Sequence, residues 1–293
     1  MDGLLIINKE KNMTSHDVVG KLRKILNTKR IGHTGTLDPN ATGVLVICVG
    51  EATKLVQFLE QDSKTYYAEI IIGMATDTYD VTGNVMEKVV CENIDKNIVQ
   101  ETLNSFITTY EQLPPMYSAI KVNGKKLYDY ARNNEEVELK GRLVTINDIK
   151  WDQKIIKHDD YLSIFIEVDV SKGTYIRSLC YDIGKKLNIP CCMGDLVRTR
   201  TGKFNINESK LLKDINVNDC NFVDMLDAID YFQYEITNTD FERQVMHGMQ
   251  IYEAKVKCYI PDTPKYIAFT KDNKLKAIYE LNDHVYKVAR LWT

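Results

Sequence analysis

The sequence predicts an α+β protein with a large N-terminal domain and a small C-terminal β domain. A chain of 293 residues is long enough for both domains to bury a core, and 44% hydrophobic residues is ordinary for a globular protein. Strand-like and helix-like segments follow one another along most of the chain, whereas its last part holds short strand-like segments. We expect the domains to comprise residues 1–235 and 236–293.

The first elements are predicted by apolar spacing and by a helix start signal. Residues 3–8 form a short apolar run that is typical of a strand. Thr14 is followed three residues later by Asp17, which is the pattern of a helix capping box, so a helix is expected at residues 15–26. A second helix is expected at residues 52–60.

Later elements alternate in the same way. Residues 64–73 and 161–170 are strand-like, and residues 97–106 and 175–187 have helical spacing. The acidic segment 214–240 is expected to form a helical closing segment before the small domain. The strands of that domain are predicted at residues 266–269, 275–279 and 286–291.

A glycine-rich loop at residues 32–43 is the most distinctive stretch. Its three glycines and one proline in twelve residues argue against helix or regular strand, and the β-branched run at 44–49 predicts a buried strand after it. A loop anchored on such a strand can hold a side chain rigidly, and Asp38 is its only carboxylate. From the residues alone, a turn-capping role for Asp38 is the more common one.

Residues 32–45 resemble the signature loop of the bacterial tRNA pseudouridine synthases of the TruB family, in which the aspartate is the catalytic nucleophile. The match keeps histidine, aspartate, proline and three glycines in register. The resemblance implies a pseudouridine synthase fold, with a large mixed β-sheet, flanking helices around a central cleft and a small C-terminal β domain. Gly248 and residues 271–279 resemble a degenerate PUA domain, an RNA-binding appendage, so the small domain is expected to be PUA-like, and an anonymous β cap is the alternative. Blocks that resemble other family motifs lie, in the family's order, at residues 3–15, 64–73, 113–132, 171–177 and 194–204.

The resemblance assigns the chemistry to three residues. Asp38 would be the nucleophile, and Arg177 would pair with it, orient it and keep it ionised. Tyr66 would pack on the uracil and could assist a proton transfer. From the residues alone, a tyrosine at a strand end is more often part of the core than catalytic, so the role of Tyr66 rests on the resemblance.

Other matched positions are expected around this group. His33 would occupy space near the flipped base, and Tyr175 and Leu196 would line the pocket. Lys9 would support the active site, and we count it with the substrate-binding residues. Asp77 matches a further position with a structural or supporting role.

Basic residues of the same blocks are expected to meet the RNA backbone. The family commonly has two adjacent arginines after the residue that corresponds to Leu196, whereas here Val197 intervenes. The basic segment at residues 21–30 would also meet the RNA. The individual candidates for backbone contacts are Lys121, Lys172, Arg198 and Arg200.

The net charge of −3 by itself argues against a nucleic-acid partner, but the charge is unevenly distributed. Residues 171–213 hold nine Lys and Arg against three Asp and Glu, whereas residues 214–250 hold one against eight. Because RNA binding requires only one basic face, this distribution is compatible with the partner that the resemblance implies, which is tRNA bound through its T stem-loop. A solvated mixed surface is the alternative on the residues alone. We expect a monomer with no obligate protein partner.

Several classes of protein are excluded by composition. No run of about 18 apolar residues exists, so no membrane span is expected, and the apolar segment at the start is too short for a signal peptide. The seven cysteines are odd in number and lack zinc-site spacing, which predicts reduced thiols in a cytoplasmic protein. We expect no metal and no cofactor, since neither a site nor a chemical step calls for one.

The resemblance therefore implies isomerisation of uridine to pseudouridine at position 55 in the T loop of tRNA, with base flipping and Asp38 as nucleophile. Whether the aspartate attacks C1′ of the ribose or C6 of the base is left open. A tRNA-binding folding chaperone is one alternative, which loss of Asp38 or Arg177 would have indicated, and both are present. A phosphatase or glycosidase would need a second carboxylate or metal-binding acids nearby, which the loop lacks.

Overall fold

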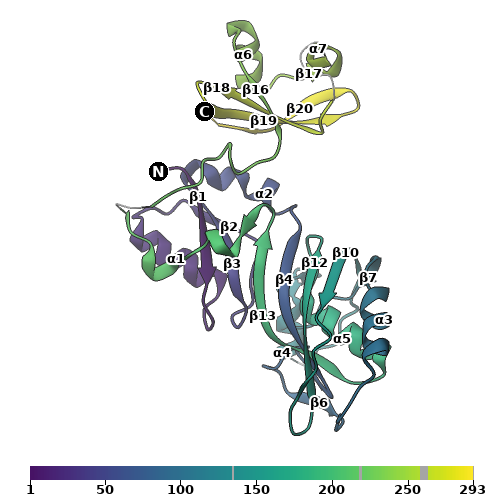
Figure 1. Ribbon diagram of the computed structural model, residues 1–293. Helices are drawn as coiled ribbons and strands as arrows, with labels where there is room; N and C mark the ends of the chain where they lie inside the picture. Colours follow the sequence, from purple (N-terminus) through teal and green to yellow (C-terminus); the bar gives the residue numbers. More distant parts are fainter. Residues whose placement is uncertain (134, 218–219, 258–262, 293) are drawn as a thin grey trace.

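The computed structural model describes residues 1–133, 135–217, 220–257 and 263–292 (Figure 1). The helices of the large domain are α1 (Ser15–Ile25), α2 (Val56–Leu59), α3 (Lys96–Ser105), α4 (Leu127–Arg132) and α5 (Ile176–Leu187). Two small ladders are formed by β5 (Met74–Thr76) with β6 (Val85–Lys88) and by β8 (Lys121–Val122) with β9 (Lys125–Lys126). The remaining strands of this domain are β1 (Gly3–Lys9), β2 (Ile31–Thr34), β3 (Thr42–Val49), β4 (Lys64–Ile72), β7 (Thr109–Gln112), β10 (Arg142–Trp151), β11 (Ile156–Lys157), β12 (Leu162–Val170), β13 (Cys191–Thr201), β14 (Phe204–Asn205) and β15 (Lys210–Leu211).

These remaining strands form one large mixed sheet, as the predicted fold requires. Its main order is β15-β1-β3-β13-β4-β12-β10-β7, and β2, β11 and β14 pair with β3, β12 and β13. β3 pairs antiparallel with β1 and parallel with β13, and each of its residues after Thr42 is buried. Arg198 on β13 lies opposite Tyr66 on β4. This register brings the start of β3, at the end of the glycine-rich loop, close to Tyr66 and Leu196.

The helix signals in the sequence are confirmed at most positions. The Thr14 hydroxyl accepts a hydrogen bond from the Asp17 backbone at 3.0 Å, and Asp17 accepts one from the Thr14 backbone at 2.8 Å. Helices α3 and α5 begin and end within a residue or so of the predicted bounds. The segment predicted as one helix at 52–60 is a 3-10 helix at Gly50–Leu55 followed by the short α2.

Two sequence expectations are wrong in detail. Residues 31–34 are not part of the loop but form β2, in which the His33 and Thr34 backbones pair with Ile47 and Val46 of β3. The loop proper is therefore residues 35–41, and its two ends are fixed by adjacent strands. The closing segment after residue 214 also forms no α-helix in its described part before Thr239, because its backbone pairs instead with β1 and with the C-terminal sheet.

The C-terminal part has the small β-sheet that the sequence predicts. Its order is β16-β18-β19-β20-β17, and β18, β19 and β20 cover the three predicted strands. The sheet begins at Phe232, four residues ahead of the boundary expected at residue 236. Its elements are β16 (Phe232–Glu235), α6 (Thr239–Met246), β17 (Ile251–Tyr252), α7 (Glu253–Lys257), β18 (Tyr266–Lys271), β19 (Lys274–Asn282) and β20 (Val285–Leu291).

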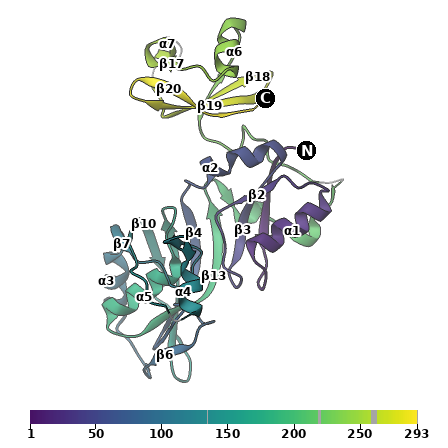
Figure 2. The same ribbon diagram turned by 180° about the vertical axis from the view of Figure 1, so that it is seen from behind.

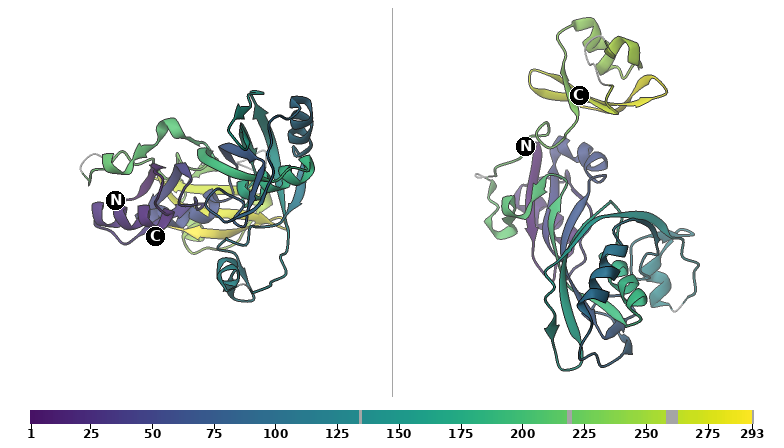
Figure 3. Two further views of the ribbon diagram at one scale, coloured as in Figure 1. Left: turned by 90° about the horizontal axis from the view of Figure 1, so that it is seen from below. Right: turned by 45° about the vertical axis from the view of Figure 1, so that its right-hand side comes forward.

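The two sheets share a hydrophobic interface. Figure 1 and the reverse view in Figure 2 show the C-terminal sheet beyond α2, at the end of the large sheet opposite β6, and Figure 3 shows the same arrangement from two further directions. Phe58 and Val46 from the large domain belong to the same buried cluster as Ile278 and Trp292. The Trp292 indole donates to the Glu51 carbonyl at 3.2 Å. The small domain is therefore packed against the large one.

Five of the six described cysteines are buried, and the described helices are short. Cys258 lies outside the described residues, and Cys220 is half-buried. Among the described residues, no helix has the length and apolar character needed to cross a bilayer. The buried cysteines are free thiols, as predicted for them, at positions 48, 91, 180, 191 and 192.

Candidate active site

The Asp38 loop, defined as residues 35–41, is fixed by Asn12 and by Ser15, the first residue of α1. The Leu37 backbone donates to the Ser15 hydroxyl at 3.0 Å, and the Leu37 side chain is buried. The Asn12 backbone donates to the Pro39 carbonyl at 3.0 Å. Asp38, between these two anchored neighbours, keeps 41% of its side chain exposed. The loop therefore holds a solvent-accessible carboxylate on a rigid support.

Lys9 is a buried support for this loop. Its ammonium donates to the carbonyls of Glu10 at 3.0 Å, Met13 at 2.7 Å and Pro39 at 3.1 Å. Burial lowers the pKa of Lys9 to about 8, although the negative charge of Asp38 opposes that shift. Because its three donors are used by backbone carbonyls, Lys9 positions the loop, and these contacts argue against its assignment as a substrate-binding residue.

Arg198 ties the two ends of the same loop together. Its Nε donates to the Val44 carbonyl at 2.7 Å and its Nη2 to the Gly35 carbonyl at 3.0 Å. Only 1% of Arg198 is exposed, which argues against the expected contact of this residue with the RNA backbone. Gly43 allows the close approach, because a Cβ there would lie 2.2 Å from the Arg198 carbonyl oxygen.

Arg177 forms the predicted ion pair with Asp38. Its Nε lies 2.9 Å from Oδ2, and its Nη2 donates a hydrogen bond to Oδ1 at 3.3 Å. Only 7% of the Arg177 side chain is exposed, so this pair is screened far less than one between two surface residues. Arg177 lies in the first turn of α5, and that helix, together with the pairing, fixes the direction of the Asp38 carboxylate.

A second carboxylate, Asp80, also lies beside Arg177, and sequence reasoning missed it. Its Oδ2 is 3.6 Å from Arg177 Nη1, which also donates to the Thr78 carbonyl at 3.2 Å. Asp77, which was expected to support the site, instead accepts from the Asn84 backbone at 2.8 Å and closes its own turn. The available signal was a second aspartate three residues after Asp77 in the same segment.

The remaining hydrogen bond of Arg177 and the position of Tyr175 are set by a neighbouring segment. Arg177 Nη2 donates to the Tyr117 carbonyl at 3.1 Å. The Tyr175 backbone donates to the side chain of Gln112 at 2.8 Å, and the same amide returns a bond to the Tyr175 carbonyl at 3.1 Å. Burial raises the pKa of Tyr175, so its ring is neutral beside the ion pair.

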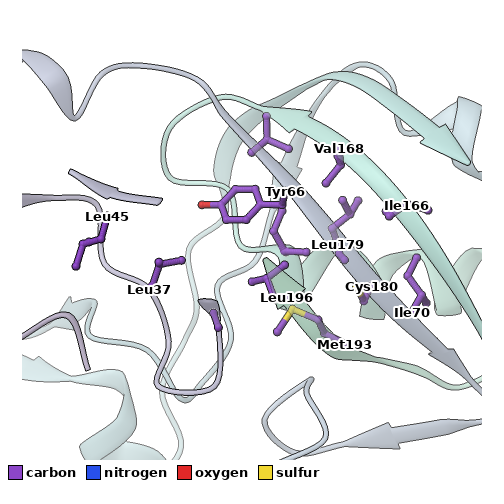
Figure 4. Close-up of a cluster of buried hydrophobic side chains, with 14 of the residues drawn as sticks. Leu37, Leu45, Tyr66, Ile70, Ile166, Val168, Leu179, Cys180, Met193 and Leu196 are labelled. Carbon is purple, nitrogen blue, oxygen red and sulfur yellow. The ribbon is translucent and has the colours of Figure 1, made fainter. Parts of the chain in front are cut away.

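An apolar wall lies beside the Asp38 loop. Tyr66 and Leu196 are each 7% exposed, whereas Tyr67, on the opposite face of β4, is 44% exposed as the strand period predicts. Figure 4 shows the Tyr66 ring among Leu37, Leu179 and Leu196 of one buried cluster. These side chains form a surface against which a planar ring could pack.

His33 lies on β2 at the edge of this region. Burial lowers its pKa, and the charges of His16 and Arg198 add to the effect, so the imidazole is neutral near pH 7. Its ring meets that of His16 edge-on, with centroids 5.8 Å apart. Within the described part of the chain, its Nδ1 is buried without a hydrogen-bond partner.

The other three candidates for contacts with the RNA backbone are Lys121, Lys172 and Arg200. Lys121 on β8 and Lys172 before α5 are exposed, and Lys172 contacts Gln61. Arg200 pairs with Asp169 and donates to the Thr65 hydroxyl at 2.9 Å. The partners of Arg200 argue against a contact with RNA, whereas Lys121 and Lys172 stay predictions.

Comparison with known proteins identifies the family. Residues 23–176 match the model of the TruB family pseudouridylate synthase (N terminal domain). The tRNA pseudouridine synthase B of Bacillus cytotoxicus is 42% identical, over 96% of this chain and 92% of the relative. That of Bacillus subtilis is 52% identical, over 71% of this chain and 68% of the relative. The chain belongs to the TruB family.

Solved structures confirm the fold expected of a TruB-family chain. A chain of a Cbf5-Nop10-Gar1 complex superposes with a TM-score of 0.71 at 22% identity, over 99% of this chain and 85% of the other. A chain of an H/ACA RNP bound to a substrate RNA containing 2'-deoxyuridine gives a TM-score of 0.69 at 21% identity, with coverage of 99% and 85%. In the described ranges, no group of three or more His, Cys, Asp or Glu side chains could hold a metal ion.

Proposed function

We propose that this TruB-family enzyme converts uridine to pseudouridine in tRNA, at position 55 in the T loop, with Asp38 as the nucleophile. One observation carries the proposal. A carboxylate that is 41% exposed is ion-paired with the buried Arg177 and stands beside the apolar wall of Tyr66 and Leu196. Such a site can take up a flat, uncharged base and present an oriented anion to it.

The reaction breaks the bond between ribose C1′ and uracil N1 and forms a bond between the same C1′ and C5. The proton on C5 is released to solvent and N1 gains one, so no oxidant or reductant is consumed. The target base must first leave the stacked loop, which costs a few kcal/mol. Tyr66 replaces part of that lost stacking when it packs on the uracil.

Arg177 supports the nucleophile in this proposal. The carboxylate of Asp38 must be ionised to attack, and the guanidinium of Arg177, 2.9 Å away at Nε, pairs with it and fixes its direction. Asp80, the Thr78 carbonyl and the Tyr117 carbonyl take up the other side of that guanidinium. Arg177 is therefore held in place before the substrate binds.

Pocket and backbone contacts complete the substrate site. His33, whose Nδ1 lacks a hydrogen-bond partner among the described residues, and Tyr175 would border the flipped base. Exposed basic residues would bind the phosphates, including Lys121 and Lys172 and the exposed cations of residues 21–30. The part after residue 235 would act as an RNA-binding appendage, in a cytoplasmic monomer that needs no protein partner.

Mapping of pseudouridine in unmodified tRNA tests the assignment. The protein should convert one uridine, at position 55, and a tRNA with cytidine at that position should stay unmodified. Conversion at another uridine would contradict the T-loop assignment. Tight binding of the tRNA without any conversion would favour a folding chaperone, which no observation of the site favours at present.

A further inference from the structure

A stacked pair of tyrosines joins the turn at residues 78–80 to the helix that carries Arg177. The Tyr79 and Tyr181 rings have centroids 4.0 Å apart and an interplanar angle of 9°. Tyr181 follows Arg177 by four residues on α5, so the two side chains lie on the same face of the helix. Lys185, a further turn along, lies 4.4 Å from the centroid of the Tyr181 ring on the same face.

The backbone at Tyr79 is strained. Its φ is 63°, in the left-handed region that a bulky aromatic residue rarely adopts. Such a conformation persists only where contacts with the surrounding structure hold it in place. The Tyr79 carbonyl accepts from the Met193 backbone at 2.9 Å, which ties the turn to β13. The ring stack ties the same residue to α5, so the turn is held from both sides.

The neighbours of Tyr79 on either side are the ones that bind Arg177. The Thr78 carbonyl accepts from Nη1 at 3.2 Å, and the Asp80 carboxylate lies 3.6 Å from the same nitrogen. Asp80 is in turn fixed by the Thr78 hydroxyl at 2.9 Å. A shift of the turn would therefore move two contacts of the guanidinium that orients Asp38.

We propose that Tyr79 and Tyr181 are positioning residues, whose stack fixes the strained turn against α5 and thereby sets the orientation of Arg177 toward Asp38. The inference rests on the proposed function, because it assigns the tyrosines a part in that same reaction. They act through Arg177 rather than on the base. Burial raises the pKa of Tyr79 to about 12, and the neighbouring Tyr181 adds to that shift, so the Tyr79 ring stays neutral over the working range.

Four substitutions separate the stack from the strain. Tyr79→Ala and Tyr181→Leu remove the stack and keep a residue with a side chain at position 79, so single-turnover release of tritium from [5-³H]uridine-labelled tRNA should slow about tenfold. Tyr79→Phe keeps the ring and should release tritium at the native rate. Tyr79→Gly removes the stack but accepts a positive φ without strain, so its rate should lie between those of Tyr79→Ala and the native protein. The Kd for tRNA should not change in any of them.

Tyr161→Ala is the matched control. Tyr161 stacks on His158 with centroids 4.2 Å apart and an interplanar angle of 15°, so its loss removes a similar contact, but from the hairpin before β12. This variant should release tritium at the native rate. The inference is overturned if Tyr181→Leu also keeps the native rate, if its rate falls only in step with tRNA affinity, or if Tyr79→Gly is slower than Tyr79→Ala.

Amide hydrogen exchange without RNA separates this inference from the proposed function. Exchange over residues 76–84 should be faster in Tyr181→Leu than in the native protein and unchanged in Tyr161→Ala. Unchanged exchange in Tyr181→Leu would overturn the role of the stack even if the protein isomerises uridine. Faster exchange in Tyr181→Leu would support it even if the reaction proved to be a different one.

Discussion

Replacing Arg198 by methionine removes the clamp across the two ends of the Asp38 loop while keeping a long side chain in place. The guanidinium donates to the Val44 carbonyl at 2.7 Å and to the Gly35 carbonyl at 3.0 Å, in a residue that is 1% exposed. Methionine cannot donate to either oxygen. Both carbonyls then lose these donors in a place that water does not easily reach.

The expected loss of stability follows from those two bonds. A buried acceptor that loses its partner costs about 1–3 kcal/mol, so two of them cost about 4 kcal/mol. Relief from burying a charge offsets part of this, which leaves about 2–3 kcal/mol. A domain of ordinary stability, roughly 5–15 kcal/mol, still folds after such a loss. The variant can therefore be purified and assayed.

Two measurements check the reasoning. Unfolding in guanidinium chloride should give the lower free energy of unfolding, and single-turnover isomerisation should slow because Asp38 is held less firmly against Arg177. Arg198→Lys is the matched variant, since it keeps the charge and can reach one of the two carbonyls. Its free energy of unfolding and its rate should lie between those of the native protein and of Arg198→Met. A native unfolding midpoint and a native rate in Arg198→Met would refute the clamp.

Two further predictions concern buried groups away from the ion pair. Burial lowers the pKa of Lys64 to about 8 from its ordinary 10.5, so the folded protein loses this proton at a lower pH than the unfolded chain does. The free energy of unfolding should therefore rise between pH 8 and pH 10.5 relative to that of Lys64→Met. The same pH dependence in both proteins would contradict this. Trp292→Ala removes a buried side chain at the interface between the sheets and should cost about 3 kcal/mol of stability. The C-terminal domain should then unfold separately and at a lower temperature, and the rate of isomerisation at saturating tRNA should not change. Retention of one native transition in calorimetry would show that the interface is not needed.

Local signals in the sequence were enough for elements whose contacts are close along the chain. The capping box of Thr14 and Asp17 lies within one helical turn, so the start of α1 was predicted correctly. The apolar run after the glycine-rich loop likewise gave β3, which is buried on both faces. The ion pair of Asp38 and Arg177 was anticipated only because a family resemblance linked two positions 139 residues apart.

The errors come from contacts that no local pattern encodes. Arginine is a common phosphate ligand, but the backbone of Arg198 passes close beside Gly43, where a Cβ would clash with it, and its side chain donates to the Val44 and Gly35 carbonyls instead. Asp80 and Arg177 are 97 residues apart, as their positions in the sequence show, and meet only because the turn at residues 78–80 packs on α5. The segment after residue 214 does not form the expected helix, because its backbone pairs with β1.

Single-turnover tritium release by Asp38→Asn, measured beside its Kd for tRNA, tests the central claim most directly. Asparagine keeps the shape of the side chain but cannot act as an anionic nucleophile. The variant should bind unmodified tRNA as tightly as the native protein and release no tritium. Release at a rate near that of the native protein would show that Asp38 is not the nucleophile, and the assignment of the site would then be wrong.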